Sequence, residues 1–249
     1  MIFSFWTASG SCASNWSLAE GIAEWRALCP DYTVFSEEQV APLLEPYGDE
    51  AATLFRRIRI PACKSDVARL VLLHRYGGLY VDAHCAPGAA DQVSLVFDWL
   101  RRWDIVLFDE SAYLPEYRHT WLLNGVFGAR AGSDLLDMLI RQAFANLAEH
   151  GKRELASPEA HVEYNIYKLT GPWMIWHAFF ERTPIGGELK GEYRDRVVIW
   201  PFDGASDKQP VRTYKYGGYR TEDALWSRRQ LTERLFEDVP AGTTVSTEE

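Results

Sequence analysis

The sequence predicts a single α/β domain with a mostly parallel sheet and helical insertions. Three observations support this fold class. The chain opens in the order strand, helix, strand, which is typical of parallel sheets. Apolar runs alternate with segments of helical periodicity along the remaining sequence. With 249 residues, 47% of them hydrophobic, and neither an internal repeat nor a Pro-, Gly- or Ser-rich linker, one domain can bury a sizeable core.

The first elements come from the opening 36 residues. Residues 2–8, IFSFWTA, form an apolar, aromatic-rich run and are predicted to be a buried strand. Residues 14–28 carry apolar side chains at helical spacing and end before Pro30, so a helix is expected there. DYTVFS, residues 31–36, then predicts a second short strand.

The centre of the chain predicts a helix followed directly by a strand. In residues 64–76, KSDVARLVLLHRY, four residues follow the i, i+3, i+4, i+7 pattern: Val67, Leu70, Val71 and His74. Ser65 is a candidate N-cap and Gly77 a candidate stop. LYVDA, residues 79–83, is the strand that follows this short turn.

The later elements follow from the same patterns. We expect helices near residues 91–102, 133–149 and 170–182, the last with Pro172 in its first turn. Strands are expected at residues 104–109, 124–129 and 196–201. The domain is predicted to span residues 1–235, and residues 236–249 are expected to form a flexible, acidic tail.

Composition excludes several classes of protein. A net charge of −9 disfavours attraction to a polyanion, so nucleic acid is not expected as a partner. The four cysteines show no CxxC spacing, which argues against a zinc site and gives no disulfide framework. The N-terminus lacks the features of a signal peptide, and no apolar run approaches the roughly 18 residues of a spanning helix. We expect a cytoplasmic protein for which peripheral membrane contact remains possible.

Asp82 and His84 lie where the predicted strand 79–83 ends and are candidate site residues. Ligands of open α/β sheets bind beyond the carboxyl ends of the strands. If the strand continued, its alternation would place both side chains on one side, where an oxygen and a nitrogen donor suit a divalent cation such as Mn²⁺. Alternatively, Asp82 caps a turn and His84 is an ordinary loop histidine.

Four further residues are candidates for ligand binding. Asp66 and Arg69 are three apart and share a helix face, where the arginine fork could hold hydroxyls or phosphate. The alternative is an ordinary surface ion pair. Trp6, near the end of the first strand, offers an aromatic ring face to a planar ligand. Asn124 could bind a ligand or could be a structural residue in a turn before Gly125.

Several segments resemble a known family in the same order. They are FSFWTAS, the Trp25 to Tyr32 stretch that ends in PDY, KSDVARLVLLHRYGGLYVDAHCAPG, LLNGVFGARAGSDLL and TGPWM. Together they resemble the glycosyltransferases whose sugar-binding region contains an Asp-any-Asp motif. That group includes fungal initiating mannosyltransferases and capsule-synthesis enzymes, and its core is similar to that of the large clostridial glucosylating toxins. The last 65 or so residues match poorly.

The resemblance implies a GT-A fold, a UDP- or GDP-sugar donor, Mn²⁺ or Mg²⁺ as cofactor, and retention of anomeric configuration. It implies that Trp6 stacks on the base, that Asp66 and Arg69 contact the donor sugar and ribose, and that Tyr80 lines the donor pocket. Asp82 would bind ribose and reach the metal. The family usually has a second Asp at the position of His84, so the metal site has one negative charge fewer here.

A second set of roles concerns the C-terminal segment YKYGGYRTEDALW, residues 214–226. The family often places a metal ligand and a tryptophan on a loop there. Glu222 or Asp223 would be the third metal ligand, and Trp226 would close over the donor. Lys215, with Arg220, would neutralise phosphate, although a surface loop of mixed charge is an equal alternative.

These features predict a retaining glycosyltransferase that transfers a hexose to a glycan or lipid-linked acceptor, as in polysaccharide biosynthesis. Asp82, Asp66 and Arg69 are the expected catalytic residues, and Asp82, His84 and Glu222 the expected metal ligands. Three alternatives remain open. They are a toxin-like transferase acting on a protein, a non-catalytic nucleotide-sugar-binding protein with a degenerate metal site, and a glycoside hydrolase using Asp66 and Asp82.

Overall fold

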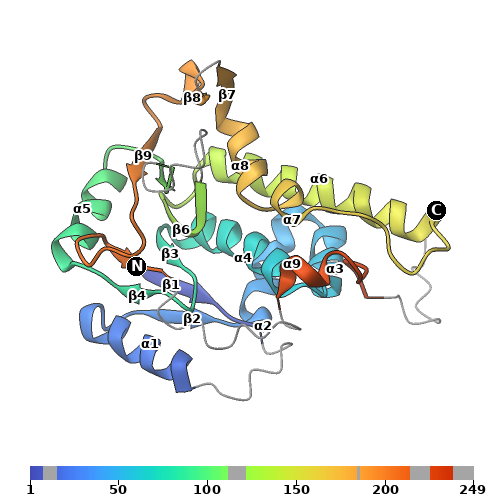
Figure 1. The fold of residues 1–249 in the computed structure, drawn as a ribbon, viewed down its shortest axis with the longest axis horizontal. Coiled ribbons are helices and arrows are strands. Elements are labelled where there is room, and N and C mark those ends of the chain that lie inside the picture. Colours follow the sequence, from blue (N-terminus) through green and yellow to red (C-terminus); the bar gives the residue numbers. More distant parts are fainter. Residues whose placement is uncertain (8–15, 112–121, 184–185, 214–224, 238–249) are drawn as a thin grey trace.

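The computed structural model describes residues 1–7, 16–111, 122–183, 186–213 and 225–237 (Figure 1). It contains a six-stranded sheet in the order β2-β1-β3-β6-β5-β9. All neighbouring pairs run parallel except those of β6, which is antiparallel to both β3 and β5. The predicted α/β class with a mostly parallel sheet is therefore confirmed.

The strands of the main sheet are short and interleaved with helices. They are β1 Ile2–Phe5, β2 Thr33–Phe35, β3 Gly78–Val81, β5 Ile105–Asp109, β6 Leu122–Ala129 and β9 Val197–Pro201. Two small pairs complete the described strands: β4 Ala86–Pro87 with β10 Val211–Arg212, and β7 Phe180–Thr183 with β8 Gly186–Leu189.

The helices are α1 Trp16–Leu28, α2 Glu37–Val40, α3 Asp49–Arg57, α4 Pro61–Tyr76, α5 Ala90–Leu100, α6 Asp134–Ala156, α7 Ile166–Leu169, α8 Pro172–Phe179 and α9 Trp226–Arg229, with 3-10 helices η1 Ala41–Tyr47 and η2 Gly191–Tyr193. In Figure 1, α1 and α5 lie to one side of the sheet, and α3, α4 and α6 lie to the other.

Two apolar layers cover the two faces of the sheet, and alternate strand residues point into each. On β3, Tyr80 joins the layer that contains α4 and α6, whereas Leu79 and Val81 join the layer of α1 and α5. This alternation is the period of two expected for a strand buried on both faces. The central strand is therefore fixed in register, and so is the residue that follows it, Asp82.

α4 begins earlier than the sequence predicts. The helix starts at Pro61, with Ile60 as its N-cap, so the assignment of Ser65 as the cap is wrong. Proline suits the first helical position because it needs no hydrogen-bond partner for its missing N–H. The predicted stop is confirmed, since Gly77 ends the helix at a φ of 63°. Gly78 follows at a φ of 107°, and a Cβ there would overlap the carbonyl oxygen of Met1.

Other boundaries also differ from the predictions. The first strand ends at Phe5 instead of residue 8, and α6 continues to Ala156, beyond residue 149. The helix expected over residues 170–182 ends at Phe179, because Phe180–Thr183 pairs with β8 as a strand. None of the described helices combines the length and the apolar character needed to cross a membrane.

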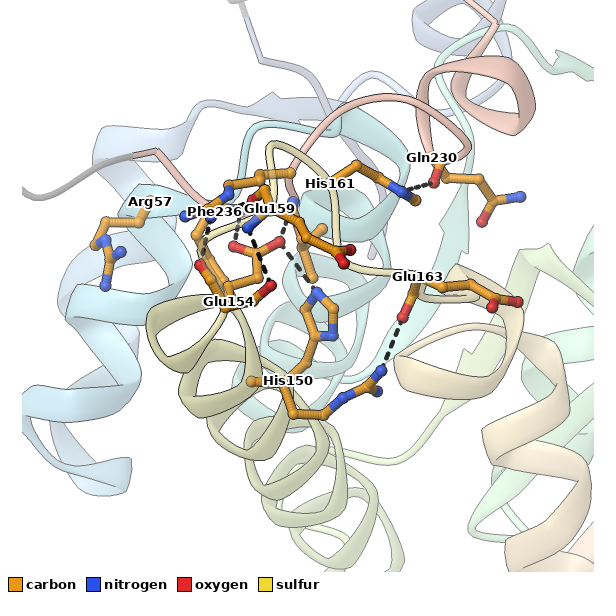
Figure 2. A network of polar contacts seen from close by, with 12 residues as sticks. Arg57, His150, Glu154, Glu159, His161, Glu163, Gln230 and Phe236 are labelled. Atoms are coloured by element: carbon orange, nitrogen blue, oxygen red, sulfur yellow. Dashed lines mark hydrogen bonds and ion pairs between the residues drawn. The ribbon is translucent and has the colours of Figure 1, made fainter.

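The C-terminal described segment packs against the far end of α6 (Figure 2). The Glu154 carboxylate accepts hydrogen bonds from the backbone N–H groups of Leu235, at 2.6 Å, and Phe236, at 3.3 Å. His150 lies 3.1 Å from the same carboxylate. Burial opposes ionisation, but His150 and the Leu235 N–H outweigh it and hold the pKa of Glu154 below its usual range. Phe236 also forms a β-bridge with Ile58, which ties the segment to α3.

Candidate functional site

Arg69 joins the two carboxylates singled out in the sequence. From α4, its Nη1 donates to Oδ1 of Asp66, one helical turn earlier, and its Nη2 donates to Oδ1 of Asp82 at 3.1 Å. The Arg69 side chain is 4% exposed and that of Asp66 is 7% exposed. The pair is therefore a buried bridge between α4 and the end of β3, and the alternative of an ordinary surface ion pair is wrong.

Tyr80 holds the same bridge from the sheet. Its hydroxyl donates to Oδ1 of Asp82 at 3.0 Å, and the Arg69 guanidinium lies over its ring, 5.0 Å from the ring centre. Burial and the Asp82 charge raise the pKa of Tyr80 well above its usual value, so its hydroxyl stays a donor. Burial disfavours the charged form of Arg69 and acts to lower its pKa. The carboxylates of Asp66 and Asp82 outweigh burial, so the pKa of Arg69 is raised.

Asp66 is held at both of its oxygens. Asn124 donates its side-chain amide to Oδ1 at 2.8 Å, and Thr170 donates its hydroxyl to Oδ2 at 3.0 Å. Burial raises the pKa of Asp66 above its usual value on balance, although Arg69 and Thr170 act to lower it. Asn124 thus contacts another candidate residue, Asp66, and a role for it in binding a sugar stays a prediction.

Asp82 keeps one oxygen without a donor from the described residues. Its Oδ1 accepts from Arg69 and Tyr80, while Oδ2 faces Gly125 of β6, where an added Cβ would lie 2.7 Å away. The Asp82 side chain is 25% exposed. Because β6 is antiparallel, its beginning lies beside the end of β3, and the Asp82 N–H donates to the Gly125 carbonyl at 2.7 Å. A glycine at this point leaves room beside the carboxylate.

His84 follows Asp82 in a turn and does not continue the strand. β3 ends at Val81, and the Cys85 N–H donates to the Asp82 carbonyl at 2.8 Å. The argument that strand alternation places Asp82 and His84 on one side is therefore wrong. His84 is buried, at 7% exposed. Within the ranges that the structure describes, no three His, Cys, Asp or Glu residues form a group that could hold a metal.

Two other predicted residues are placed by the described structure. Trp6 follows β1, and its N–H donates to the Phe35 carbonyl at 2.9 Å, so it lies at the same edge of the sheet as Asp82 because β1 and β3 are parallel. Trp226 begins α9 and packs edge-on against Tyr167 of α7, with ring centres 5.1 Å apart. Lys215, Arg220, Glu222 and Asp223 lie outside the described residues, so the third metal ligand remains a prediction.

Two residues at this edge were not predicted. Thr170 was expected only to help start a helix, yet its hydroxyl reaches Asp66. Glu110 follows β5, and burial, together with Asp109 and Asp203, raises its pKa to about 7. For Glu110 a signal was present, because LFDE places acids directly after a buried strand as YVD does. For Thr170 no local pattern signals its partner, since the two residues are far apart in sequence.

Part of this site coincides with a match to a protein family. Residues 17–87 match the family model described as "Glycosyltransferase sugar-binding region containing DXD motif". The matched stretch includes Asp66, Arg69, Tyr80 and Asp82, whereas Asn124 and Thr170 lie outside it. A search of curated proteins finds no matching sequence.

Solved structures with similarity to this chain include three from glycosyltransferases. The structure titled "PaToxG Glycosyltransferase" is 16% identical with a TM-score of 0.47, over 71% of this chain and 67% of that one. The ligand-free glycosyltransferase domain from the YGT toxin is 11% identical with a TM-score of 0.34, over 51% of this chain. Its UDP-bound form is 10% identical with a TM-score of 0.33, over 53% of this chain. The similarity spans only 37% and 38% of the two YGT toxin chains.

Proposed function

We propose that this protein is a glycosyltransferase of the GT-A fold that uses a nucleotide-sugar donor. The observation that carries the proposal is the buried Arg69 bridge between Asp66 and Asp82, within the stretch that matches the glycosyltransferase family model. The bridge lies where β3 ends, and open α/β sheets bind their ligands at that edge. Outside a binding site, a buried arginine facing one buried and one partly exposed carboxylate would be a costly arrangement.

Each residue of the bridge suits a role in binding the donor. The Asp82 side chain is 25% exposed and its Oδ2 lies beside Gly125, which has no side chain to cover it, so we propose that a ribose hydroxyl or a cation reaches this oxygen. Asp66, held by three donors, can accept a hydrogen bond from a sugar hydroxyl through its remaining lone pairs. The Nε of Arg69 is buried and has no partner among the described residues. Trp6 supplies a ring for the base.

A divalent metal fits the donor chemistry of the same edge. Asp82, through Oδ2, and His84, through its imidazole, would hold it, with Glu222 as the proposed third ligand. A carboxylate oxygen and an imidazole nitrogen, completed by phosphate oxygens, suit Mn²⁺, and Mg²⁺ is the alternative. When bound, the metal would neutralise negative charge on the donor diphosphate.

The remaining chemistry falls to the chain and the substrates. Arg69 and Tyr80 fix Asp82 through its other oxygen, so the free oxygen is oriented before the donor binds. We propose retention: the acceptor hydroxyl attacks the anomeric carbon from the face that the diphosphate leaves. The bond from the anomeric carbon to the diphosphate oxygen breaks, the departing phosphate takes the hydroxyl proton, and a dedicated general base is not required.

The proposed substrates are a UDP- or GDP-hexose and a glycan or lipid-linked acceptor, in cytoplasmic polysaccharide biosynthesis. Two readings compete with this one. A toxin-like enzyme would transfer the same sugar to a protein. A non-catalytic binding protein would explain why His84 stands where the family motif has its second Asp.

The test measures donor binding and donor hydrolysis. Thermal shift with UDP- and GDP-sugars, with and without Mn²⁺, should show metal-dependent stabilisation by one donor class, accompanied by slow release of free sugar. Asp82→Asn should abolish both responses, whereas Asp98→Asn, which changes an exposed ion pair on α5, should leave them unchanged. Donor binding that does not depend on metal, without release of free sugar, would favour a non-catalytic nucleotide-sugar-binding protein. No response to any nucleotide sugar would overturn the proposal.

A further inference from the structure

We propose that Thr170 is a positioning residue, which orients Asp66 for the transferred sugar by donating its hydroxyl proton to Oδ2. This inference rests on the proposed function, because it assigns Asp66 to the donor sugar. Thr170 is 1% exposed and Asp66 is 6% exposed. Because the Thr170 hydroxyl is directed at Asp66, we expect any effect that it has on donor chemistry to act through that carboxylate.

The two oxygens of the Asp66 carboxylate accept hydrogen bonds from three different donors. Oδ1 accepts from Arg69 and Asn124, and Oδ2 accepts from Thr170. The three donors come from α4, from β6 and from the junction between α7 and α8. Without Thr170, both remaining donors would act on one oxygen, and the carboxylate as a whole would be held less firmly against rotation about its Cβ–Cγ bond. Hydrogen bonds to an ionised acceptor are among the stronger ones in proteins.

The second argument is that the Thr170 hydroxyl is itself held rigidly. The Thr170 N–H donates to the Ile166 carbonyl at 3.1 Å, closing the turn of α7. The Oγ1 atom also lies 3.5 Å from the thiol sulfur of Cys63, one turn before Asp66 on α4. β-Branched side chains have few χ1 rotamers, so a threonine fixed at both its backbone and its hydroxyl is a stiff donor.

The third argument is the close approach of the next residue. A Cβ on Gly171 would lie 2.9 Å from the Tyr167 Cα and 3.3 Å from Oδ2 of Asp66. The glycine therefore lets the backbone of this junction seat directly beside the carboxylate. A side chain at residue 171 would push the junction, and the Thr170 hydroxyl with it, away from Asp66.

The junction is supported in turn by the C-terminal segment. Trp226 packs edge-on against Tyr167, and the side-chain oxygen of Gln230 accepts the Ile166 N–H at 3.2 Å. α7 is thus held by two contacts with the C-terminal segment. This arrangement offers a route by which Trp226 acts on the donor site without touching the donor, as a support for the turn that ends in Thr170.

The test separates the hydroxyl from the volume of the side chain. Thr170→Val keeps the shape and removes the donor, whereas Thr170→Ser keeps the donor. For donor hydrolysis, we expect Thr170→Val to lower kcat/KM about tenfold or more and Thr170→Ser to stay within about threefold of the wild type. The affinity for the free nucleoside diphosphate should change less than twofold in both, because Asp66 addresses the sugar. Thr33→Val, on β2, removes a hydroxyl that contacts only a backbone carbonyl and serves as the control.

The possible outcomes decide the inference. If Thr170→Val hydrolyses the donor like the wild type, or if Thr170→Ser is impaired to the same degree as Thr170→Val, the hydroxyl does not position Asp66. If Thr170→Val fails to fold, Thr170→Ala and Thr170→Ser replace it as a pair, since neither adds volume, and equal activity in the two overturns the inference. A wild-type protein that neither binds nor hydrolyses any nucleotide sugar would instead overturn the proposed function.

Discussion

At the scale of single residues, the site depends on Arg69 more than on either acid. Its two terminal nitrogens reach different carboxylates, and its planar group covers the Tyr80 ring. Lysine carries the same charge but has one compact donor group that cannot bridge Asp66 and Asp82 in this way. The geometry of the two acids relative to each other is thus set by the guanidinium fork.

We therefore predict that Arg69→Lys lowers both stability and donor hydrolysis. Leaving a buried carboxylate without its partner should cost about 3 kcal/mol of unfolding free energy, and hydrolysis should fall by about a hundredfold or more. Urea unfolding and a free-sugar assay measure the two effects. Arg101→Lys is the matched control, because Arg101 forms an i,i+3 pair with Asp98 on an exposed helix surface. Equal stability in the two variants would contradict the prediction.

Glu110 predicts a pH dependence of stability. Its pKa in the folded protein is raised to about 7, mainly by burial, so the folded state binds a proton that the unfolded state releases near the usual value. The stabilisation is then fully present at acid pH and is lost as pH rises through 7. Since part of the side chain is exposed and screened, we expect a loss of about 1–2 kcal/mol. The stability of Glu110→Gln, measured by thermal melts, should change less between pH 5.5 and 8 than that of the wild type. If the two proteins showed the same dependence on pH, this account would be contradicted.

Some of these residues could be predicted from the sequence and others could not. The spacing of Asp66 and Arg69, and the position of Asp82 at the end of a strand, follow from local patterns. The contact of Thr170 with Asp66 does not, because a hydroxyl carries no spacing rule and its partner lies 104 positions away. For His84 a local rule was used outside its range. The alternation of side chains along a strand was applied to residues 82–84, although β3 ends at Val81.

At the scale of elements, the six strands of the main sheet were found, but the direction of β6 and the small strands β4, β7, β8 and β10 were not. The pattern of residues 124–129 predicts a strand, and nothing local states that it runs against its neighbours. That reversal brings the start of β6 to the site, and with it Asn124 and Gly125. The short segments α2 and η1 were also missed, because they are too brief to show a clear period. α3 was missed as well, although its buried residues Ala51, Leu54 and Phe55 follow the i, i+3, i+4 pattern.

In the turn between α4 and β3, Gly78 is required both by its positive φ and by the lack of space for a side chain. Gly78→Ala should lower the unfolding free energy by about 3 kcal/mol or more, because the new Cβ meets both a positive φ and the Met1 backbone. Gly48→Ala, also at a positive φ but with open space around it, should cost only about 1 kcal/mol. Thermal or urea unfolding of the two variants isolates the steric part. Equal losses would show that the turn can relax.

At the scale of the whole molecule, the C-terminal described segment covers part of the core. Leu235 and Phe236 are buried in the layer that contains α3 and α6, and Glu154 binds the backbone of both. The Glu237 N–H also donates to the Arg57 carbonyl at 2.9 Å. We therefore propose that the domain extends through Glu237, two residues beyond the boundary expected from the sequence.

Truncation tests that boundary. A chain ending at residue 237 should melt within about 2 °C of the full protein, whereas one ending at residue 234 should lose several kcal/mol. The loss has two sources: two apolar side chains leave the core, and the buried Glu154 carboxylate loses two donors. Circular dichroism melts of both chains measure it. If the shorter chain were as stable as the longer one, residues 235–237 would not belong to the domain.

The bridge between Ile58 and Phe236 also constrains how the protein is made. Its flanking residues, Arg57 and Glu237, are 180 positions apart, so the ribosome completes α3 long before the residues that cover it exist. During that interval the apolar face of α3 and the far end of α6 lack part of their final cover, and such faces attract other chains. Slow translation of the second half of the message should therefore increase the dependence of this protein on chaperones.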